Sequence, residues 1–238
     1  AIVHHKLKES TVVTTIVVLL LLAAGGGIAL VTQTGLLVFL LGGLSFLIGI
    51  LYSFGPIPIS RMPLGELFSG LFMGFVIIFI SAYIHTDDSV VMLLIQHGWV
   101  QLHINILEVF YLFWFSVPAI LGIAGIMLAN NICDIEDDLE NRRYTLPVYI
   151  GKKNAVILFK LLYYVSYVDL IVLLLLRVNV LLVLLILLTL IPLQRNISAF
   201  TQKQDKATTF ILSVKNFVLM NAARIVILGA AIILKLLG

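Results

Sequence analysis

Residues Val12–Val31 read VVTTIVVLLLLAAGGGIALV, a run of twenty positions without a charged side chain. A hydrocarbon core of about 30 Å is crossed by about 20 helical residues, because each residue rises about 1.5 Å. The run is therefore long enough to cross a bilayer. It is also longer than the apolar region of a secretory signal, which spans about 7–15 residues. This stretch predicts a transmembrane helix and places the chain among membrane proteins.

The composition of the whole chain agrees with this prediction. Of its 238 residues, 61% are hydrophobic and 11% are charged, whereas a soluble domain has about 45–50% and about 25%. These values exclude an ordinary soluble domain and a disordered chain. The single cysteine, Cys133, excludes an intrachain disulfide and a cysteine-based zinc site. The net charge is +3, but the basic residues form no stripe with interleaved aromatic residues, so we expect no nucleic-acid partner.

Seven apolar runs predict an all-α membrane protein with a single transmembrane domain. Lipid-exposed backbone must bond internally, and these runs lack the alternation of barrel strands, so helices are expected. The segment 89–105 is also apolar, but two histidines and a glycine interrupt it. We expect it to form an interfacial or half-inserted helix, with Trp99 at the headgroup level. The predicted spans are 12–32, 36–54, 66–86, 106–130, 154–176, 179–193 and 210–236.

Basic residues are distributed unevenly between the two ends of these spans. Two of them, Arg177 and Lys235, fall on one side, and ten fall in loops on the other. Loops rich in Lys and Arg stay on the cytoplasmic side. We therefore expect the loop 131–153 to be cytoplasmic in the cell membrane and the C-terminus to lie outside. The ten are Lys6, Lys8, Arg61, Arg142, Arg143, Lys152, Lys153, Arg195, Lys203 and Lys206.

Acidic residues gather at the cytoplasmic end of the fourth span. Five of the twelve lie within 134–140, and Asn130, Asp134 and Asp138 follow one another at intervals of four, which places them on one helix face. Clustered carboxylates repel one another unless a cation lies among them, and oxygen ligands of this kind suit Mg²⁺ together with substrate phosphate. The row predicts half of a magnesium–diphosphate site, to which Asp137 is a further possible ligand.

Arg142 and Arg143 follow the acidic residues. Guanidinium groups bind phosphate oxygens through paired hydrogen bonds, which favours a diphosphate site. Two alternatives stay open: the arginines set the topology alone, and the acidic run is a solvated loop. The spacing of Asn130 and the presence of both arginines favour the metal site, although D-x-x-x-D is a weak motif by itself.

The segment Asn130–Asn154, NNICDIEDDLENRRYTLPVYIGKKN, resembles the second aspartate motif of the UbiA superfamily of intramembrane prenyltransferases. The likeness is closest to the branch that prenylates dihydroxynaphthoate in menaquinone biosynthesis. The loop 52–66, the glycines Gly70 and Gly74, and the stretch 83–86 resemble that branch too. The resemblance implies a bundle of nine transmembrane helices around a central cavity, with two aspartate motifs that hold Mg²⁺ and a polyprenyl diphosphate.

The resemblance also implies a reaction. The polyprenyl group passes from its diphosphate to dihydroxynaphthoate, the acceptor loses its carboxylate, and the product is demethylmenaquinone. Arg143 matches a basic position that faces the diphosphate. The resemblance implies that Asp134 and Asp138 are catalytic residues and that these two, with Asn130, are magnesium ligands. The implied substrate-binding residues are Asn130, Arg143, Tyr52 and Tyr83.

The chain departs from the family pattern at three points. The first aspartate motif, expected just before Ala1–Val3, is not in the sequence, and seven spans stand where nine are expected. We therefore expect that the domain 1–238 lacks its first two helices. Cys133 stands where many members carry Arg, and Arg142 where many carry Gly.

Other functions are weighed against this one. A related enzyme would use hydroxybenzoate, homogentisate, haem or chlorin as its acceptor. A CDP-alcohol phosphotransferase would carry a D-G-x-x-A-R element, which is not found here. A transporter or channel is disfavoured, because the acidic residues form a single cluster at the cytoplasmic side and only Asp169 could line a central ion path. A non-catalytic quinone-binding or scaffold protein is favoured if the first motif is truly missing.

Two charges fall deep inside predicted spans. Asp169 and Arg224 lie about 21–22 Å along the fifth and seventh spans at about 1.5 Å per residue. Both spans run outward, so the two depths match. A charge within a membrane is costly and is usually paired. We predict an Asp169–Arg224 ion pair with a structural role.

Overall fold

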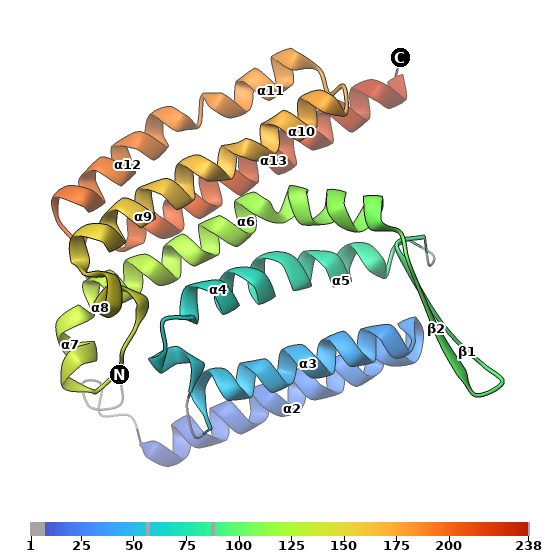
Figure 1. The fold of residues 1–238 in the computed structure, drawn as a ribbon, viewed down its shortest axis with the longest axis horizontal. Helices are drawn as coiled ribbons and strands as arrows, with labels where there is room; N and C mark the ends of the chain where they lie inside the picture. The colour runs from blue at the N-terminus through green and yellow to red at the C-terminus, as the bar shows by residue number, and fades with distance from the viewer. Residues whose placement is uncertain (1–7, 56–57, 87–88, 238) are drawn as a thin grey trace.

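The computed structural model describes residues 8–55, 58–86 and 89–237. Within these residues, seven helices are long and apolar enough to cross a membrane, and they run back and forth as one bundle (Figure 1). The predicted all-α membrane fold is confirmed. The spans are α2 (Glu9–Thr34), α3 (Leu36–Ser53), α4–η2–α5 (Gly65–Tyr83), α6 (Ile106–Cys133), α9–η3–α10 (Lys152–Leu175), α11–α12 (Val180–Gln202) and α13 (Ile211–Leu237).

Shorter elements lie between and within these spans. The third span consists of α4 (Gly65–Ser69), the π-helical segment η2 (Gly70–Val76) and α5 (Ile77–Tyr83), and the fifth of α9 (Lys152–Val165), η3 (Ser166–Val168) and α10 (Asp169–Leu175). The remaining short elements are η1 (Ile59–Arg61), β1 (Val91–Gln96), β2 (Trp99–Ile104), α7 (Ile135–Glu140) and α8 (Leu146–Ile150).

The sixth span is longer than its predicted range of 179–193. Helix α11 (Val180–Leu187) is followed by a tight turn, and α12 (Leu190–Gln202) continues it. Pro192 has no N–H to donate to the preceding turn, which explains the interruption. The second half of α12 is polar on one face, but Ile197 and Phe200 of the other face are buried. This amphipathic extension has a lower mean hydropathy than a uniformly apolar span, so the length of the apolar run does not predict that the helix continues to Gln202.

The prediction of a helix over 89–105 is wrong. Strands β1 and β2 form an antiparallel hairpin instead. The connecting residues His97 and Gly98 both have positive φ, at 51° and 80°, as a two-residue primed turn requires. In β2, aliphatic residues alternate with Gln101 and His103, which is the period of a strand. β1 is a nearly continuous apolar run, and such a run does not distinguish a strand from a helix by its period.

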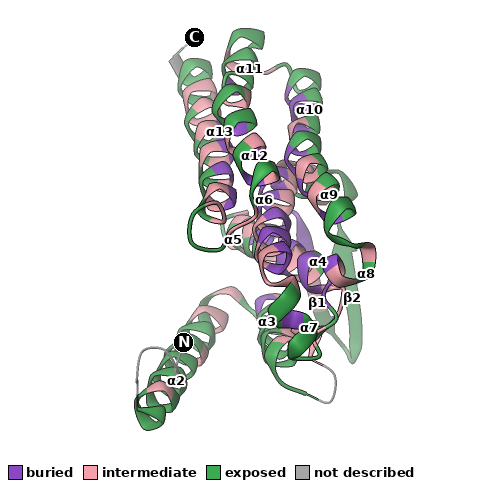
Figure 2. Ribbon diagram, turned by 90° about the vertical axis from the view of Figure 1, so that its left-hand side faces the viewer, coloured by how far each residue is buried: buried purple, intermediate pink, exposed green. Residues whose placement is uncertain are grey.

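Helix α6 lies at the centre of the bundle, and its buried positions stand out in Figure 2. It packs against η2, α9, α13 and α4. The contact with η2 is close because of two glycines. A Cβ at Gly74 would lie 2.5 Å from Ile120 Cα, and one at Gly70 would lie 2.8 Å from the Ile120 carbonyl oxygen. Any larger residue would therefore push the third span away from α6.

The predicted ion pair inside the membrane is confirmed. Arg224 Nε lies 2.6 Å from Asp169 Oδ2, and Nη2 lies 2.8 Å from Asp169 Oδ1. The same guanidinium donates to the carbonyl oxygens of Met220 at 3.0 Å and Ser166 at 3.2 Å. Both side chains are buried, so the charges compensate each other where no water does.

The described basic loop residues gather at one end of the bundle. The connections after α3, after α6 and between α12 and α13 lie together at the left of Figure 1, with the start of α2. Arg177 and Lys235 lie at the opposite end, with the hairpin and the turn between α2 and α3. The grouping of loops predicted from charge is thus confirmed for Lys8, Arg61, Arg142, Arg143, Lys152, Lys153, Lys203 and Lys206, while Arg195 lies on α12 and Lys6 falls outside the described residues.

Candidate functional site

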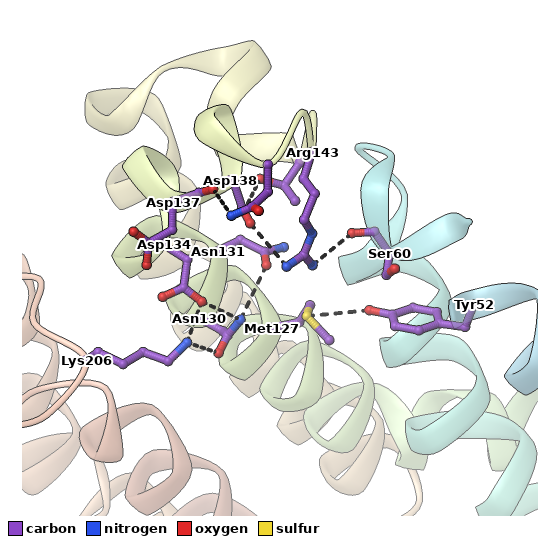
Figure 3. Close-up of polar contacts among 12 residues, drawn as sticks. Tyr52, Ser60, Met127, Asn130, Asn131, Asp134, Asp137, Asp138, Arg143 and Lys206 are labelled. Atoms are coloured by element: carbon purple, nitrogen blue, oxygen red, sulfur yellow. Dashed lines mark hydrogen bonds and ion pairs between the residues drawn. The ribbon is translucent and has the colours of Figure 1, made fainter. Parts of the chain in front are cut away.

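Helix α6 ends within the predicted row, after Asn130 and before Asp138. Its last residue is Cys133, and Asp134 leaves helical geometry with φ −102° and ψ 10° before α7 begins. Asn130 and Asp134 stay together on the last turn, because Asn130 Nδ2 donates to Asp134 Oδ2 at 3.3 Å. The break turns Asp138 away from the other two (Figure 3). The three residues do not form one straight row.

A lysine from a distant loop joins the first two residues. Lys206 Nζ lies 2.5 Å from Asp134 Oδ2 and also donates to Asn130 Oδ1. It comes from the connection between α12 and α13, more than seventy positions along the chain. Its side chain is 47% exposed and that of Asp134 is 23% exposed. The pair is therefore reachable from solvent, and its mutual attraction is partly screened.

Asp138 has a different environment. It is 2% exposed, the Thr145 hydroxyl donates to its Oδ2 at 3.0 Å, and Arg143 Nη1 lies 3.3 Å from its Oδ1. The backbone N–H of Arg143 donates to the Asp138 carbonyl oxygen at 2.8 Å. Arg143 Nη2 also donates to the carbonyl oxygen of Ser60 at 3.2 Å. Asp138 thus fixes Arg143 between two loops, and the Arg143 side chain is left about one-third exposed.

The two tyrosines predicted to bind substrate lie at opposite ends of the bundle. Tyr52, at the end of α3, approaches the site: its hydroxyl lies 3.6 Å from Met127 Sδ and accepts from Ser69 Oγ at 3.4 Å. Tyr83 ends α5 and is buried against Phe79, with ring centroids 6.2 Å apart. A helical span of this length covers about 27 Å, so the structure does not bring Tyr83 to the aspartates.

Other predicted residues of this region are less enclosed. Asp137 and Arg142 are exposed. Pro56 and Ile57 of the loop 52–66 lie outside the described residues, as does the segment Ala1–Val3 before which the first aspartate motif was expected.

Sequence reasoning missed a buried pair beside the site. Asn131 Nδ2 donates to Glu66 Oε1 at 3.0 Å, and both side chains are buried. Glu66 Oε2 has no hydrogen-bond partner among the described residues. Asn131 follows Asn130 in the sequence, which is a weak signal. Nothing in the sequence pairs it with Glu66, or Lys206 with Asp134, because both contacts join segments far apart in the chain.

The loop that carries Lys206 is held by its neighbour Asp205. The Asp205 carboxylate accepts from the Thr208 hydroxyl at 2.6 Å and from the Thr208 N–H at 2.8 Å. The hydrogen bond from the Thr208 hydroxyl, followed by that from the Thr208 N–H, lowers the pKa of Asp205 below its ordinary value. Asp205 therefore stays ionised and keeps the turn in shape at neutral pH.

The donor set at the end of α6 fits a hard cation in part. The lysine ammonium lies between an amide oxygen and a carboxylate oxygen, which is the position of a cation between oxygen ligands. Over the described residues, no group of three or more His, Cys, Asp or Glu side chains is placed to hold a metal. A cation held by Asn130 and Asp134 would therefore take its remaining ligands from water or from a substrate. Beside it, Lys206 and Arg143 offer two cations to an anion.

Comparison with known proteins gives a consistent result. The sequence model of the UbiA prenyltransferase family matches residues 1–221. The chain is 32% identical over 168 residues to 1,4-dihydroxy-2-naphthoate octaprenyltransferase from Bacillus subtilis (strain 168), a match that covers 71% of this chain and 48% of that protein. It is 28% identical over 133 residues to UbiA prenyltransferase domain-containing protein 1 from Dictyostelium discoideum, covering 55% of this chain and 34% of that protein. The matches thus extend over half or less of each relative. No solved structure matches.

Proposed function

This chain belongs to the UbiA prenyltransferase family, and we propose that it transfers a polyprenyl group from its diphosphate to 1,4-dihydroxy-2-naphthoate, giving demethylmenaquinol, the reduced form of demethylmenaquinone. The observation that carries the proposal is the contact of Lys206 with Asn130 and Asp134. The lysine ammonium lies between two oxygen acceptors at the end of an apolar bundle, in the position that a cation would take. The named activity of the Bacillus subtilis relative supports the choice of acceptor.

The diphosphate is the part of the substrate that these residues recognise. Lys206 and Arg143 lie at the same end of the bundle, and each keeps a partly exposed cationic group there. Arg143 is held in place by Asp138 and Ser60, so little of its freedom is lost when it binds phosphate oxygens. Tyr52 lies nearby, towards the apolar interior, where the first carbons of the prenyl chain would lie.

The reaction begins when the allylic C–O bond breaks and its electron pair leaves with the diphosphate. The ring carbon that bears the carboxylate then attacks the allylic cation, a C–C bond forms, and CO₂ departs as the ring regains its aromaticity. Lys206 and Arg143 stabilise the charge that develops on the leaving diphosphate. The apolar helices exclude water, which would otherwise capture the cation.

Members of this family generally depend on a divalent metal ion, and we propose Mg²⁺ here. Asn130 and Asp134 would hold it, and when bound it would supply positive charge to the diphosphate oxygens. Asp138, which was expected to be a third ligand, positions Arg143 instead. Lys206, which now bonds Asn130 and Asp134, would then be free to donate to phosphate oxygens. We also propose that this end of the bundle faces the cytoplasm at the cell membrane, because the basic loops gather there.

The test is prenyl transfer in liposomes by protein expressed from its complete gene. Radiolabelled polyprenyl diphosphate would be offered with dihydroxynaphthoate, and in parallel with hydroxybenzoate. Glu136→Gln removes one exposed carboxylate from the same acidic turn and is the matched control for Asp134→Asn.

The proposal predicts metal-dependent prenylation of dihydroxynaphthoate that Asp134→Asn loses and Glu136→Gln retains. Prenylation of hydroxybenzoate alone would keep the family and overturn the acceptor. Binding of quinone without transfer to any acceptor would contradict an enzymatic function and favour a binding role.

A further inference from the structure

The pairing of β1 with β2 sorts their side chains into two faces of different chemistry. Residues directly opposite each other in an antiparallel pair point to the same face, and successive residues alternate. One face is entirely aliphatic and consists of Val91, Leu93, Ile95, Val100, Leu102 and Ile104. The other carries every polar side chain of the two strands and consists of Met92, Leu94, Gln96, Trp99, Gln101 and His103.

The aliphatic face is left uncovered over most of its length. Ile95, Val100 and Leu102 are exposed by 58%, 67% and 53%, respectively. Val91, at the base of the hairpin, is buried in a cluster that includes Val38 of α3. An aliphatic surface of this kind needs an apolar partner, because water does not compensate its exposure.

The position of the hairpin indicates which partner this is. It leaves the end of the bundle between α5 and α6 and runs across the helix direction, past the ends of α2 and α3 (Figure 1). Because Val91 packs with residues of α3 and α5, the aliphatic face turns towards the side on which the spans lie. Ile106 and Leu107, which follow the hairpin on α6, are also exposed, so the aliphatic face continues the lipid-facing surface of the bundle.

Charge and backbone bonding set the depth at which the hairpin lies. The segment 89–105 contains no Asp, Glu, Lys or Arg, so no ionic group prevents it from entering the headgroup region. A two-stranded sheet leaves N–H and C=O groups unpaired along its outer edges, and such groups do not lie exposed in hydrocarbon. The hairpin thus fits the interface, where aliphatic side chains reach acyl chains and edge groups reach water.

We propose that the β1–β2 hairpin lies flat on the bilayer at the end of the bundle opposite the aspartates. Its aliphatic face contacts the upper acyl chains of the phospholipids, and its polar face points to water. Trp99, at the turn, sits at headgroup level. This surface extends the lipid contact of the protein beyond the bundle and is independent of the proposed prenyl transfer.

Single-tryptophan variants of the whole chain test the proposal. Trp99→Phe and Trp114→Phe remove the two natural tryptophans, and Val100→Trp, Gln101→Trp or Leu102→Trp adds one reporter to that background. Each protein is reconstituted in phosphatidylcholine vesicles whose acyl chains are brominated near the headgroup or near their ends. Acrylamide in the buffer reports access from water.

The expected pattern alternates with a period of two. Reporters at positions 100 and 102 are quenched by shallow bromines and are protected from acrylamide at least about threefold more than the reporter at 101. Equal acrylamide quenching at all three positions, with no quenching by lipid, would place the hairpin in water. Protection that grows with the protein-to-lipid ratio would assign the face to a second copy of the chain. Either result overturns the proposal.

A second pair of variants covers the case in which the introduced tryptophans disturb the turn. In the Trp114→Phe protein, Trp99 is the reporter, and Val100→Asp is compared with Gln101→Asp. A charge on the aliphatic face should release the hairpin from the bilayer and reduce the quenching of Trp99 by shallow bromines several-fold, whereas the same charge on the polar face should leave this quenching unchanged. Equal effects of the two substitutions, with the helical signal of the bundle intact, would contradict the assignment of the two faces.

Discussion

The ion pairs Asp169–Arg224 and Asp134–Lys206 place the same charges in two different settings. The first lies within the membrane, is almost fully buried, and has two contacts between the side chains as well as two backbone acceptors. The second lies at the end of the bundle, is partly exposed, and shares its lysine with Asn130. A buried pair resists exchange because either charge alone is strongly unfavourable. An exposed pair exchanges partners at little cost, as the proposed site for metal and diphosphate requires.

The largest expected effect comes from breaking the buried pair. Asp169→Arg or Arg224→Asp leaves two like charges inside the membrane and should lower the free energy of unfolding by about 3–5 kcal/mol or more. The double exchange Asp169→Arg/Arg224→Asp should recover part of this loss. Thermal unfolding in detergent measures both effects. A double variant no more stable than the single ones would show that the pair does not act as a unit.

Removing the charge of the exposed pair should affect activity and not stability. Asp134→Asn should reduce prenyl transfer roughly 100-fold, equivalent to about 3 kcal/mol of transition-state stabilisation. Its unfolding free energy should change by less than about 1 kcal/mol, because the pair is partly exposed. Activity and thermal unfolding are measured on the same preparation. A loss of stability as large as that of the Asp169 variants would remove the distinction between the two pairs.

Lys206 should contribute to binding of the diphosphate. Lys206→Gln removes one charged hydrogen bond to phosphate, which is worth about 1.5–3 kcal/mol. We therefore expect the KM for the prenyl diphosphate to rise about tenfold or more. Lys203→Gln is the control, because the Lys203 side chain is 70% exposed and pairs with Asp205 of its own loop. Similar KM values for the two variants would assign Lys206 to the loop and not to the substrate.

The smallest expected effect concerns the turn that carries Lys206. Because the pKa of Asp205 is lowered by Thr208, its ionised form stabilises the fold above the ordinary value of 3.8, and this contribution is lost as the pH falls through the lowered pKa. Thr208→Val removes the hydroxyl donor and should raise the pKa of Asp205 towards 3.8. Carboxyl ¹³C NMR titration measures the shift. Activity between pH 5 and 8 should not respond to this group, and an unchanged pKa in the variant would exclude the hydroxyl as the cause.

Most of the membrane topology could be predicted from the sequence. Long apolar runs specify their own helices, because a bilayer leaves the backbone no other way to satisfy its hydrogen bonds. The depths of Asp169 and Arg224 along their spans were sufficient to pair them. The hairpin over 91–104 was missed because β1 is a short apolar run, whose period does not separate a strand from a helix. The polar half of α12 was missed because it is amphipathic, so its mean hydropathy is low.

The candidate site was predictable only in part. The spacing of Asn130 and Asp134 correctly placed them together, but the same reasoning put Asp138 beside them, and it assumed that the helix continues. The helix breaks at Asp134, so Asp138 bonds to Thr145 and Arg143 instead. Lys206 and Glu66 reach the site through tertiary contacts, which no local sequence pattern predicts.

Direct measurement of metal binding at the exposed pair tests the central claim. Electron paramagnetic resonance of Mn²⁺, used in place of Mg²⁺, would be recorded with an unreactive prenyl thiodiphosphate, on the wild type, Asp134→Asn and Glu136→Gln. The account predicts bound Mn²⁺ in the wild type and in Glu136→Gln, and its loss in Asp134→Asn. Equal binding by all three proteins would contradict the assignment of Asp134 as a ligand and the claim that its pair with Lys206 exchanges for metal.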